Sequence, residues 1–160
     1  MRVGVISDTH GLMRPEALRA LAGSELIVHA GDIGGPDILA ALRAIAPLVV
    51  VRGNNDFGSW AEVIPEAVDV EVAGRRVHVV HDVADAARVK ADIIITGHSH
   101  QPRNQVVRGT LMFNPGSAGP RRFTLPITVG ILRFHGAATE PAQHSSKPGF
   151  EGAEIVTLLP

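Results

Sequence analysis

Short apolar runs without alternation mark the first hundred residues of the chain. They are rich in Val and Ile, and they cover residues 3–6, 26–28, 48–51, 77–80 and 93–95. Continuous apolar runs of this length are typical of strands that a sheet buries on both faces. The pattern therefore predicts a buried β-sheet at the centre of the fold.

Helical periodicity occupies several of the intervals between these runs. Residues 15–22 and 36–46 each begin with a proline, which suits the first turn of a helix, and each carries apolar side chains on one face. Residues 84–90 predict a third, shorter helix that Asp82 or Asp85 could cap. Because strands and helices alternate here, we expect the strands of the first half to be parallel.

The second half of the chain reads as hairpins. Two-residue turn signals, Ala73-Gly74 and Arg108-Gly109, each separate two strand segments: residues 68–72 and 76–80, and residues 104–107 and 110–113. Residues 127–134 and 154–158 predict closing strands, and residues 139–152 predict an exposed loop. We find no repeat and no linker, so the α/β chain is expected to form one domain over residues 1–160. Either one mixed sheet or two packed sheets would accommodate these elements.

Composition narrows the classes of function. The formal net charge is -1 and no Lys/Arg cluster stands out, so nucleic-acid binding or membrane attachment through a basic face is not expected. No apolar run approaches the roughly 20 residues that cross a bilayer. Cysteine is absent, which excludes disulfides and thiolate chemistry. Polar residues begin at Asp8, too early for a secretory signal, and together these features favour the cytoplasm.

Polar residues follow each predicted buried strand at its carboxyl end. They are Asp8-Thr9-His10, His29-Ala30-Gly31-Asp32, Gly53-Asn54-Asn55-Asp56, His81-Asp82 and Gly97-His98-Ser99-His100. Open α/β sheets bind ligands at this edge. Asp8 and His10, like His98 and His100, are two residues apart, so in an extended chain each pair projects to one side. The spacing is that of chelating pairs.

The residue types indicate which metals such a site could hold. Carboxylates, imidazoles and one amide oxygen, without sulfur, suit Mn²⁺, Fe, Zn²⁺ or Ni²⁺ better than Ca²⁺ or Cu⁺. Seven ligands are too many for one such ion. Singly, each residue could instead be a cap, a turn residue or a structural histidine. We expect His29 to support the site or the core, and His78, His135 and His144 to lie at the surface or in satisfied positions.

Taken together, the five blocks resemble the signature motifs of the calcineurin-like metallophosphoesterases. The short chain and Asn114-Pro115-Gly116-Ser117 resemble the small branch of that family, with YfcE-type phosphodiesterases and Vps29. The resemblance implies a four-layer α/β/β/α sandwich of two mixed β-sheets flanked by helices. It also implies phosphoester hydrolysis by a hydroxide that bridges two divalent metal ions. We expect Mn²⁺, with Ni²⁺, Zn²⁺ or Fe as alternatives.

The resemblance also assigns roles to individual residues. It places Asp8, His10, Asp32 and His100 around one ion, and Asp32, Asn54, His81 and His98 around the other. Asp32 would bridge the ions, and Asp32, Asn54, Asn55 and His98 would form the catalytic set. Arg52 and Asn55 are the candidates for contacting phosphate, although Arg52 could equally be a surface residue.

Two positions depart from the family pattern. Many larger members have a histidine where this chain has Asn55, and an amide cannot protonate a leaving group near neutral pH. Asn55 therefore favours diesters or activated aryl esters. Asp82 replaces a frequent glycine, and it would either orient His81 or cap the following helix.

Two functions remain in competition. One is a phosphodiesterase acting on a small or nucleotide-like substrate, and the other is a non-catalytic scaffold of the Vps29 type. All seven ligand positions hold competent ligands, which a scaffold does not need, so we favour the enzyme. Phe57 and Trp60 would either stack on a base or fill a gap in the core. Edge strands could pair in a homo-oligomer.

Overall fold

The computed structural model describes residues 1–135 and 149–160. Most of the predicted loop over residues 139–152, and with it His144, lies outside the described residues. Residues 150–152 do not belong to a loop, because they open the last strand of the fold, β10 (Phe150–Leu159). No helix among the described residues is both long enough and apolar enough to span a bilayer.

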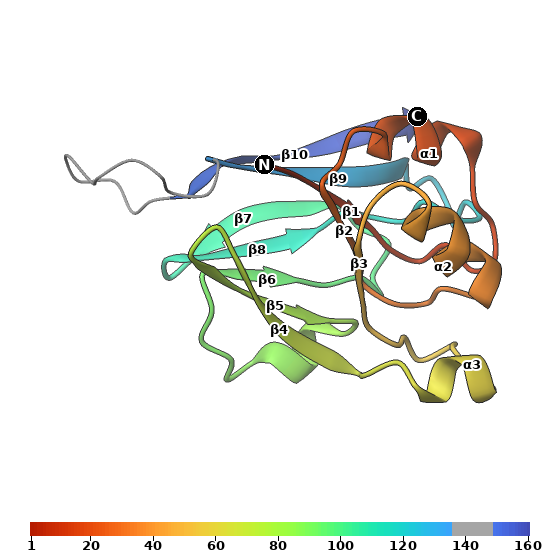
Figure 1. The fold of residues 1–160 in the computed structure, drawn as a ribbon, viewed down its shortest axis with the longest axis horizontal. Coiled ribbons are helices and arrows are strands. Elements are labelled where there is room, and N and C mark those ends of the chain that lie inside the picture. Colours follow the sequence, from red (N-terminus) through yellow and green to blue (C-terminus); the bar gives the residue numbers. More distant parts are fainter. Residues whose placement is uncertain (136–148) are drawn as a thin grey trace.

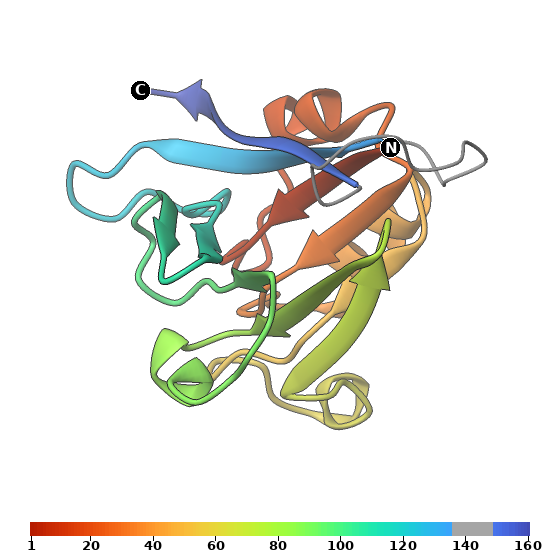
Figure 2. The ribbon, with the colours of Figure 1, turned by 90° about the vertical axis from the view of Figure 1, so that its left-hand side faces the viewer.

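The first sheet combines the parallel strands of the N-terminal half with the last two strands of the chain (Figure 1). Its order is β10-β9-β1-β2-β3, with β1 (Arg2–Ile6), β2 (Leu26–His29), β3 (Leu48–Val50) and β9 (Ile127–Phe134). Strands β1, β2 and β3 are parallel, and Figure 2 shows β1 and β2 pointing the same way. Strand β9 is antiparallel to both β1 and β10. The predicted parallel core is confirmed.

Helices α1 (Pro15–Leu21) and α2 (Pro36–Arg43) cover the outer face of this sheet (Figure 1). Both begin with the predicted proline, and their buried side chains, such as Leu21 and Leu42, pack with Ile6 and Ile27. A further one-turn helix, α3 (Ser59–Glu62), was not predicted. Its Trp60 packs against the same core, as expected of a gap-filling residue.

The second sheet has the order β4-β5-β6-β8-β7. Its strands are β4 (Ala67–Val72), β5 (Arg75–Val80), β6 (Ile93–Ile95), β7 (Arg103–Val107) and β8 (Thr110–Asn114). Both predicted hairpins form, β4 with β5 and β7 with β8. At both turns the two central residues have positive φ, as a type I′ turn requires.

The two sheets bury a common core between their inner faces. It includes Val5 and Val28 from the first sheet and Val79, Ile95 and Phe113 from the second. The two mixed sheets with flanking helices confirm the expected sandwich. The outer layer on the second sheet is thin, because a 3₁₀ turn, η1 (Val83–Ala86), stands where a helix over residues 84–90 was predicted. That segment buries only a small cluster, too little apolar surface to hold a longer helix.

Candidate metal centre

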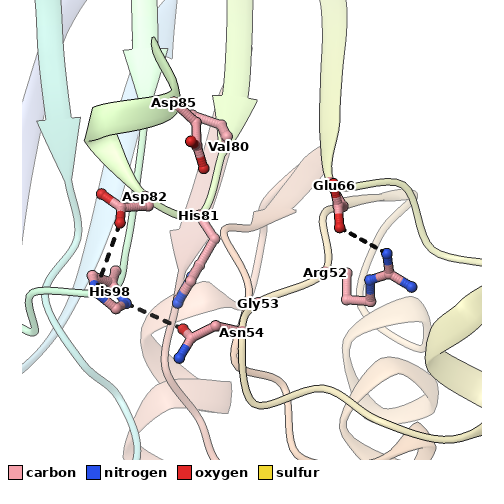
Figure 3. Close-up of a pocket in the computed structure, with 9 residues that line it drawn as sticks. All are labelled: Arg52, Gly53, Asn54, Glu66, Val80, His81, Asp82, Asp85 and His98. Carbon is pink, nitrogen blue, oxygen red and sulfur yellow. Dashed lines mark hydrogen bonds and ion pairs between the residues drawn. The ribbon is translucent and has the colours of Figure 1, made fainter. Parts of the chain in front are cut away.

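The predicted ligands converge at the carboxyl ends of strands from both sheets. Asp8 and His10 follow β1, Asp32 follows β2 and Asn54 comes after β3, whereas His81 follows β5 and His98 and His100 come after β6. The site therefore lies at the edge where the carboxyl ends of both sheets meet. In Figure 3, His81 and Asn54 lie between the pair Arg52 and Glu66 on one side and the pair His98 and Asp82 on the other.

Asp8, His10 and His100 form one potential ligand group. One ligand atom from each lies within 4.8 Å of the others. His100 Nε2 is 3.3 Å from Asp8 Oδ1 and 3.4 Å from His10 Nε2. The Asp8 Oδ1 atom is buried and has no hydrogen-bond partner. Since an unpaired buried carboxylate oxygen is costly, this atom requires an additional partner, such as a cation.

Asp8, Asp32 and His81 form a second group with the same spacing. His81 Nε2 is 3.4 Å from Asp32 Oδ2, and His10 Nε2 is 3.6 Å from that same oxygen. His81 Nδ1 lies 2.7 Å from the Ala30 carbonyl, which can only accept, so Nδ1 carries the donated proton and Nε2 faces the site. The same Asp32 oxygen therefore lies close to His10, a predicted ligand of one ion, and to His81, a predicted ligand of the other.

Asn54 and His98 form the outer wall of the site. His98 Nδ1 is 3.2 Å from Asn54 Oδ1 (Figure 3), and about half of the His98 side chain is exposed. His98 Nε2 is 3.8 Å from Asp82 Oδ2. Asp82 Oδ1 accepts a hydrogen bond from the Ala84 amide, so Asp82 does cap the following turn. The alternative that Asp82 orients His81 is wrong, because its free oxygen faces His98.

The two candidate phosphate-binding residues are already engaged. The backbone N and the side-chain Nδ2 of Asn55 donate to the two carboxylate oxygens of Asp32, each at 2.9 Å. Arg52 Nη2 lies 2.9 Å from Glu66 Oε1. In this structure Asn55 holds Asp32 in place, and the charge of Arg52 is balanced at the edge of the pocket.

The ionisation of the site follows from these contacts. Burial raises the pKa of Asp32, but hydrogen bonds from His81 and Asn55 outweigh it and hold that pKa well below the usual range. Burial lowers the pKa of His81, but Asp32 and the Ala30 carbonyl raise it above its ordinary value. Burial lowers the pKa of His10, against the charges of Asp32 and Asp8. Asp32 is thus an anion throughout the neutral range.

The backbone at the ligands is not extended. Positive φ angles occur at Asp8, His10, Asp32, His98 and His100. The prediction that each pair projects to one side because its backbone is extended is therefore wrong for Asp8 with His10 and for His98 with His100. The side chains of Asp8 and His10 nevertheless converge. Left-handed backbone at non-glycine residues is uncommon and concentrates at functional sites.

Glycines allow the ligand loops to approach one another closely. A Cβ atom at Gly97 would lie 2.0 Å from Ser7 Oγ, and one at Gly53 would lie 2.2 Å from Asp32 Oδ1. A Cβ atom at Gly31 would lie 2.6 Å from His81 Nδ1. A side chain at Gly53 or Gly31 would therefore overlap a predicted ligand, and one at Gly97 would overlap Ser7, which donates to the Asp8 carboxylate.

Two buried residues support the site, and one of them had no role assigned from the sequence. Asp56 accepts hydrogen bonds from the amides of Ile33, Gly34 and Gly53, which ties the loop after β2 to the loop after β3. This supporting role follows from the burial and the hydrogen bonds of Asp56, neither of which can be inferred from the sequence. His29, placed by prediction in the core or beside the site, is fully buried and contacts Thr9 Oγ1 at 2.9 Å. Burial lowers its pKa to about 4.

The remaining described histidines lie away from the ligands. His78 pairs with Asp69 at 2.9 Å, and His135 pairs with Glu151 at 2.7 Å. Neither contacts a predicted ligand in any recorded hydrogen bond or ion pair of the described residues. The donor set at the site, carboxylates and imidazoles with buried unpartnered atoms at Asp8 Oδ1 and His81 Nε2, fits divalent transition-metal ions.

Comparison with known proteins also indicates a phosphoesterase that binds metal. A model of the calcineurin-like phosphoesterase superfamily domain matches residues 1–137. A probable metallophosphoesterase of Methanothermobacter thermautotrophicus is 38% identical over 152 residues, which cover 85% of this chain and 87% of the relative.

Solved structures share the fold. An archaeal phosphodiesterase aligns with a TM-score of 0.71 at 25% identity, over 82% of this chain and 93% of that protein. Entamoeba histolytica Vps29, solved in complex with zinc, aligns with a TM-score of 0.71 at 21% identity, over 99% of both chains. YfcE from E. coli also shares this fold. The chain therefore belongs to the calcineurin-like phosphoesterase superfamily, and it shares the fold of YfcE and Vps29.

Proposed function

We propose that this phosphoesterase is a phosphodiesterase that uses two divalent metal ions. The observation that carries the proposal is the buried, unpartnered Asp8 Oδ1, which lies within reach of His100, together with Asp32 Oδ2, which lies within 3.6 Å of both His10 and His81. Burying these carboxylates without a compensating positive charge would destabilise the fold, and bound cations would supply that charge. The resemblance to an archaeal phosphodiesterase supports the same reaction class.

The described residues divide between two positions. Asp8, His10, Asp32 and His100 would hold one ion, and Asp32, Asn54, His81 and His98 the other. When bound, two such ions supply a hydroxide nucleophile and positive charge that stabilises the phosphate in the transition state. Mn²⁺ is our choice for both positions. The cytoplasmic location, the absence of nucleic-acid partners and a homo-oligomer stay predictions.

The residues of the chain determine what the site can do besides binding metal. Asn55 holds both oxygens of Asp32, which keeps this carboxylate oriented and ionised. Neither Asn55 nor Arg52 carries a proton acidic enough to assist a leaving group. Substrates whose leaving group departs as a stable anion should therefore react best. This favours activated aryl esters and diesters over serine or threonine phosphates.

The test is hydrolysis of bis(p-nitrophenyl) phosphate beside p-nitrophenyl phosphate. Metal-stripped protein is refilled in turn with Mn²⁺, Ni²⁺, Zn²⁺ and Mg²⁺, and bound metal is counted in each sample. We expect metal-dependent cleavage that prefers the diester. Asp32→Ala should abolish it and lose bound metal, whereas Asp69→Asn, on the outer face of the second sheet, should behave like the unchanged protein.

A Vps29-type scaffold is the second candidate, because several neighbours in fold are Vps29 proteins and one was solved with zinc. Folded protein that binds two ions yet cleaves neither ester with any metal would favour the scaffold. Folded protein that binds no ion would contradict both the metal centre and the enzyme.

A further inference from the structure

The segment that follows β8 packs directly against a proposed metal ligand. Ser117 Oγ donates to the Asp8 carbonyl at 3.0 Å. A Cβ atom at Gly119 would lie 2.3 Å from that same carbonyl and 2.5 Å from the Thr9 carbonyl. Glycine at this position lets the chain approach the loop that carries Asp8 and His10. Residues 119–125, here called the 119–125 loop, therefore start beside the metal centre.

Hydrogen bonds fix both ends of the 119–125 loop. Arg14 Nε and Nη2 donate to the Gly119 carbonyl at 3.3 and 3.2 Å. Arg121 Nη1 donates to the Leu125 carbonyl at 3.3 Å, and its Nη2 donates to the Pro160 carbonyl at 2.7 Å. A turn closes the loop where the Leu125 amide donates to the Arg122 carbonyl. Its anchored ends hold Arg122 and Phe123 at the exposed tip.

Arg122 differs from the other arginines around the centre. Arg52 is balanced by Glu66, and Arg14 and Arg121 are bound to carbonyl oxygens. Within the described part of the chain, no ion pair is recorded for Arg122, which is exposed. Arg122 follows Gly119 by three residues, and Gly119 packs against the Asp8 and Thr9 carbonyls of the ligand loop. Arg122 is thus an uncommitted guanidinium on a loop that starts beside the metal centre.

Phe123 stands next to Arg122 with almost its whole side chain in solvent. It is 91% exposed, and its φ of 53° places it in the left-handed region, which an aromatic residue rarely adopts. A ring that packs against nothing gives the fold no stabilisation that would explain this conformation. Phe57, predicted as a stacking candidate, is also exposed, but the hollow that it lines has the carboxylates of Asp56, Glu62 and Glu66 against the single guanidinium of Arg52, and this negative balance opposes a phosphate ester.

We propose that the 119–125 loop recognises the substrate, with Arg122 binding a phosphate oxygen and Phe123 stacking on an aromatic group attached to that phosphate. The substrate class is then a phosphodiester that bears a nucleoside or an aryl group. This inference rests on the proposed function, because it places the phosphate at the metal centre. Guanidinium groups suit phosphate oxygens, and aromatic rings stack on any base.

The test measures the binding of inorganic phosphate and of adenosine monophosphate to the Mn²⁺-loaded protein by calorimetry. Arg122→Ala should weaken both ligands, each by on the order of tenfold. Phe123→Ala should weaken adenosine monophosphate by on the order of tenfold and leave inorganic phosphate unchanged. Arg108→Ala, in the exposed turn between β7 and β8, and Phe57→Ala should change neither.

Several outcomes would overturn the inference. Phe123→Ala that weakens both ligands equally would indicate a structural role, and Phe123→Ala that weakens neither would remove the stacking contact. Arg122→Ala indistinguishable from Arg108→Ala would exclude the phosphate contact. In these cases hydrolysis of bis(p-nitrophenyl) phosphate by the unchanged protein would persist, so the inference alone would fail. Unchanged protein that cleaves no ester with any metal would instead remove the proposed function.

Discussion

At the scale of single residues, the candidate ligands occupy backbone conformations that the chain adopts only at a cost. Left-handed φ costs a non-glycine residue about 1–2 kcal/mol, and Asp8, His10, Asp32, His98 and His100 all adopt it. The surrounding hydrogen bonds hold them there: the His10 amide donates to the Asp32 carbonyl, and the Asp8 amide donates to the Gly31 carbonyl. The strain is therefore concentrated where the side chains must converge, as expected of a functional site.

The sequence supplied the identity of these residues but not their conformation. Regular spacing of Asp and His at strand ends was sufficient to predict which side chains meet. Their φ angles depend on contacts between loops that are distant in the chain, such as the His98 amide with Asp8 Oδ2. For the same reason Asp56 had no assigned role, because its partners are backbone amides that carry no sequence signal.

Asp82 offers a prediction at this scale. Its carboxylate is 3.8 Å from His98 Nε2, so it favours the tautomer that carries the proton on Nε2 and leaves the Nδ1 lone pair free to bind a metal ion. We expect Asp82→Asn to keep the cap on η1 and to weaken the binding of the second ion by roughly 10- to 100-fold, with the first ion unaffected. Chelator competition with Mn²⁺ would measure both affinities.

Asp85→Asn is the matched control, because Asp85 lines the same pocket without a recorded contact to His98. If Asp82→Asn and Asp85→Asn change the second affinity equally, the effect is one of general charge, and the specific role of Asp82 is excluded.

At the scale of elements, strands and tight turns were predictable because their signals are local. Continuous Val and Ile runs identified β1, β2, β5 and β6, and two-residue turn signals identified both hairpins. The short helical elements were not predictable. Four-residue α3 has no periodicity to detect, and η1 has a capped start but too small a buried face to continue. The strand pattern alone also left open whether the strands form one sheet or two, and only the family resemblance predicted two.

The close approach of loops gives a prediction for an element. Alanine at Gly97 would place its Cβ 2.0 Å from Ser7 Oγ and 2.8 Å from Asp8 Oδ2, which bind each other at 2.7 Å. We expect Gly97→Ala to destabilise the fold by about 1–3 kcal/mol and to weaken metal binding, because Asp8 must shift. Denaturant unfolding and metal titration would measure the two effects.

Gly152→Ala provides the comparison, since a Cβ atom there meets nothing within 4 Å. It should leave metal affinity unchanged. Gly97→Ala with normal metal affinity would show that the loop after β6 moves freely relative to Asp8, contrary to the contacts described here.

At the scale of the whole molecule, stability should depend on pH through His29. Burial lowers its folded pKa to about 4, from an unfolded value near 6.5. The unfolded chain therefore binds a proton that the folded protein excludes. The contribution of His29 to stability is fully present above about pH 6.5, and it falls by up to about 3 kcal/mol as pH drops toward 4.

Denaturant unfolding of metal-free protein between pH 7 and pH 4.5 measures this dependence. His29→Gln should be less stable at pH 7 and lose less stability on acidification than the unchanged protein. His81, whose pKa is raised, contributes the opposite slope, but it is present in both proteins and cancels in their difference. His135→Gln, at an exposed position, should follow the unchanged protein. Parallel curves for His29→Gln and the unchanged protein would contradict the neutral, buried state of His29.

The metal centre joins the two sheets, so metal binding should stabilise the whole molecule rather than one loop. Asp8, His10 and Asp32 follow strands of the first sheet, and His81 and His100 follow strands of the second. An ion present at one hundred times its dissociation constant adds about 2.7 kcal/mol to the free energy of unfolding. For a chain of this size that corresponds to a rise in melting temperature of roughly 5–10 °C.

Hydrogen exchange should slow in β1 and in β6 together, and Ca²⁺, which prefers oxygen ligands, should have a smaller effect than Mn²⁺. Protection confined to the loop after β1 would mean that the ion binds to the first sheet alone, and a site shared by both sheets would be excluded.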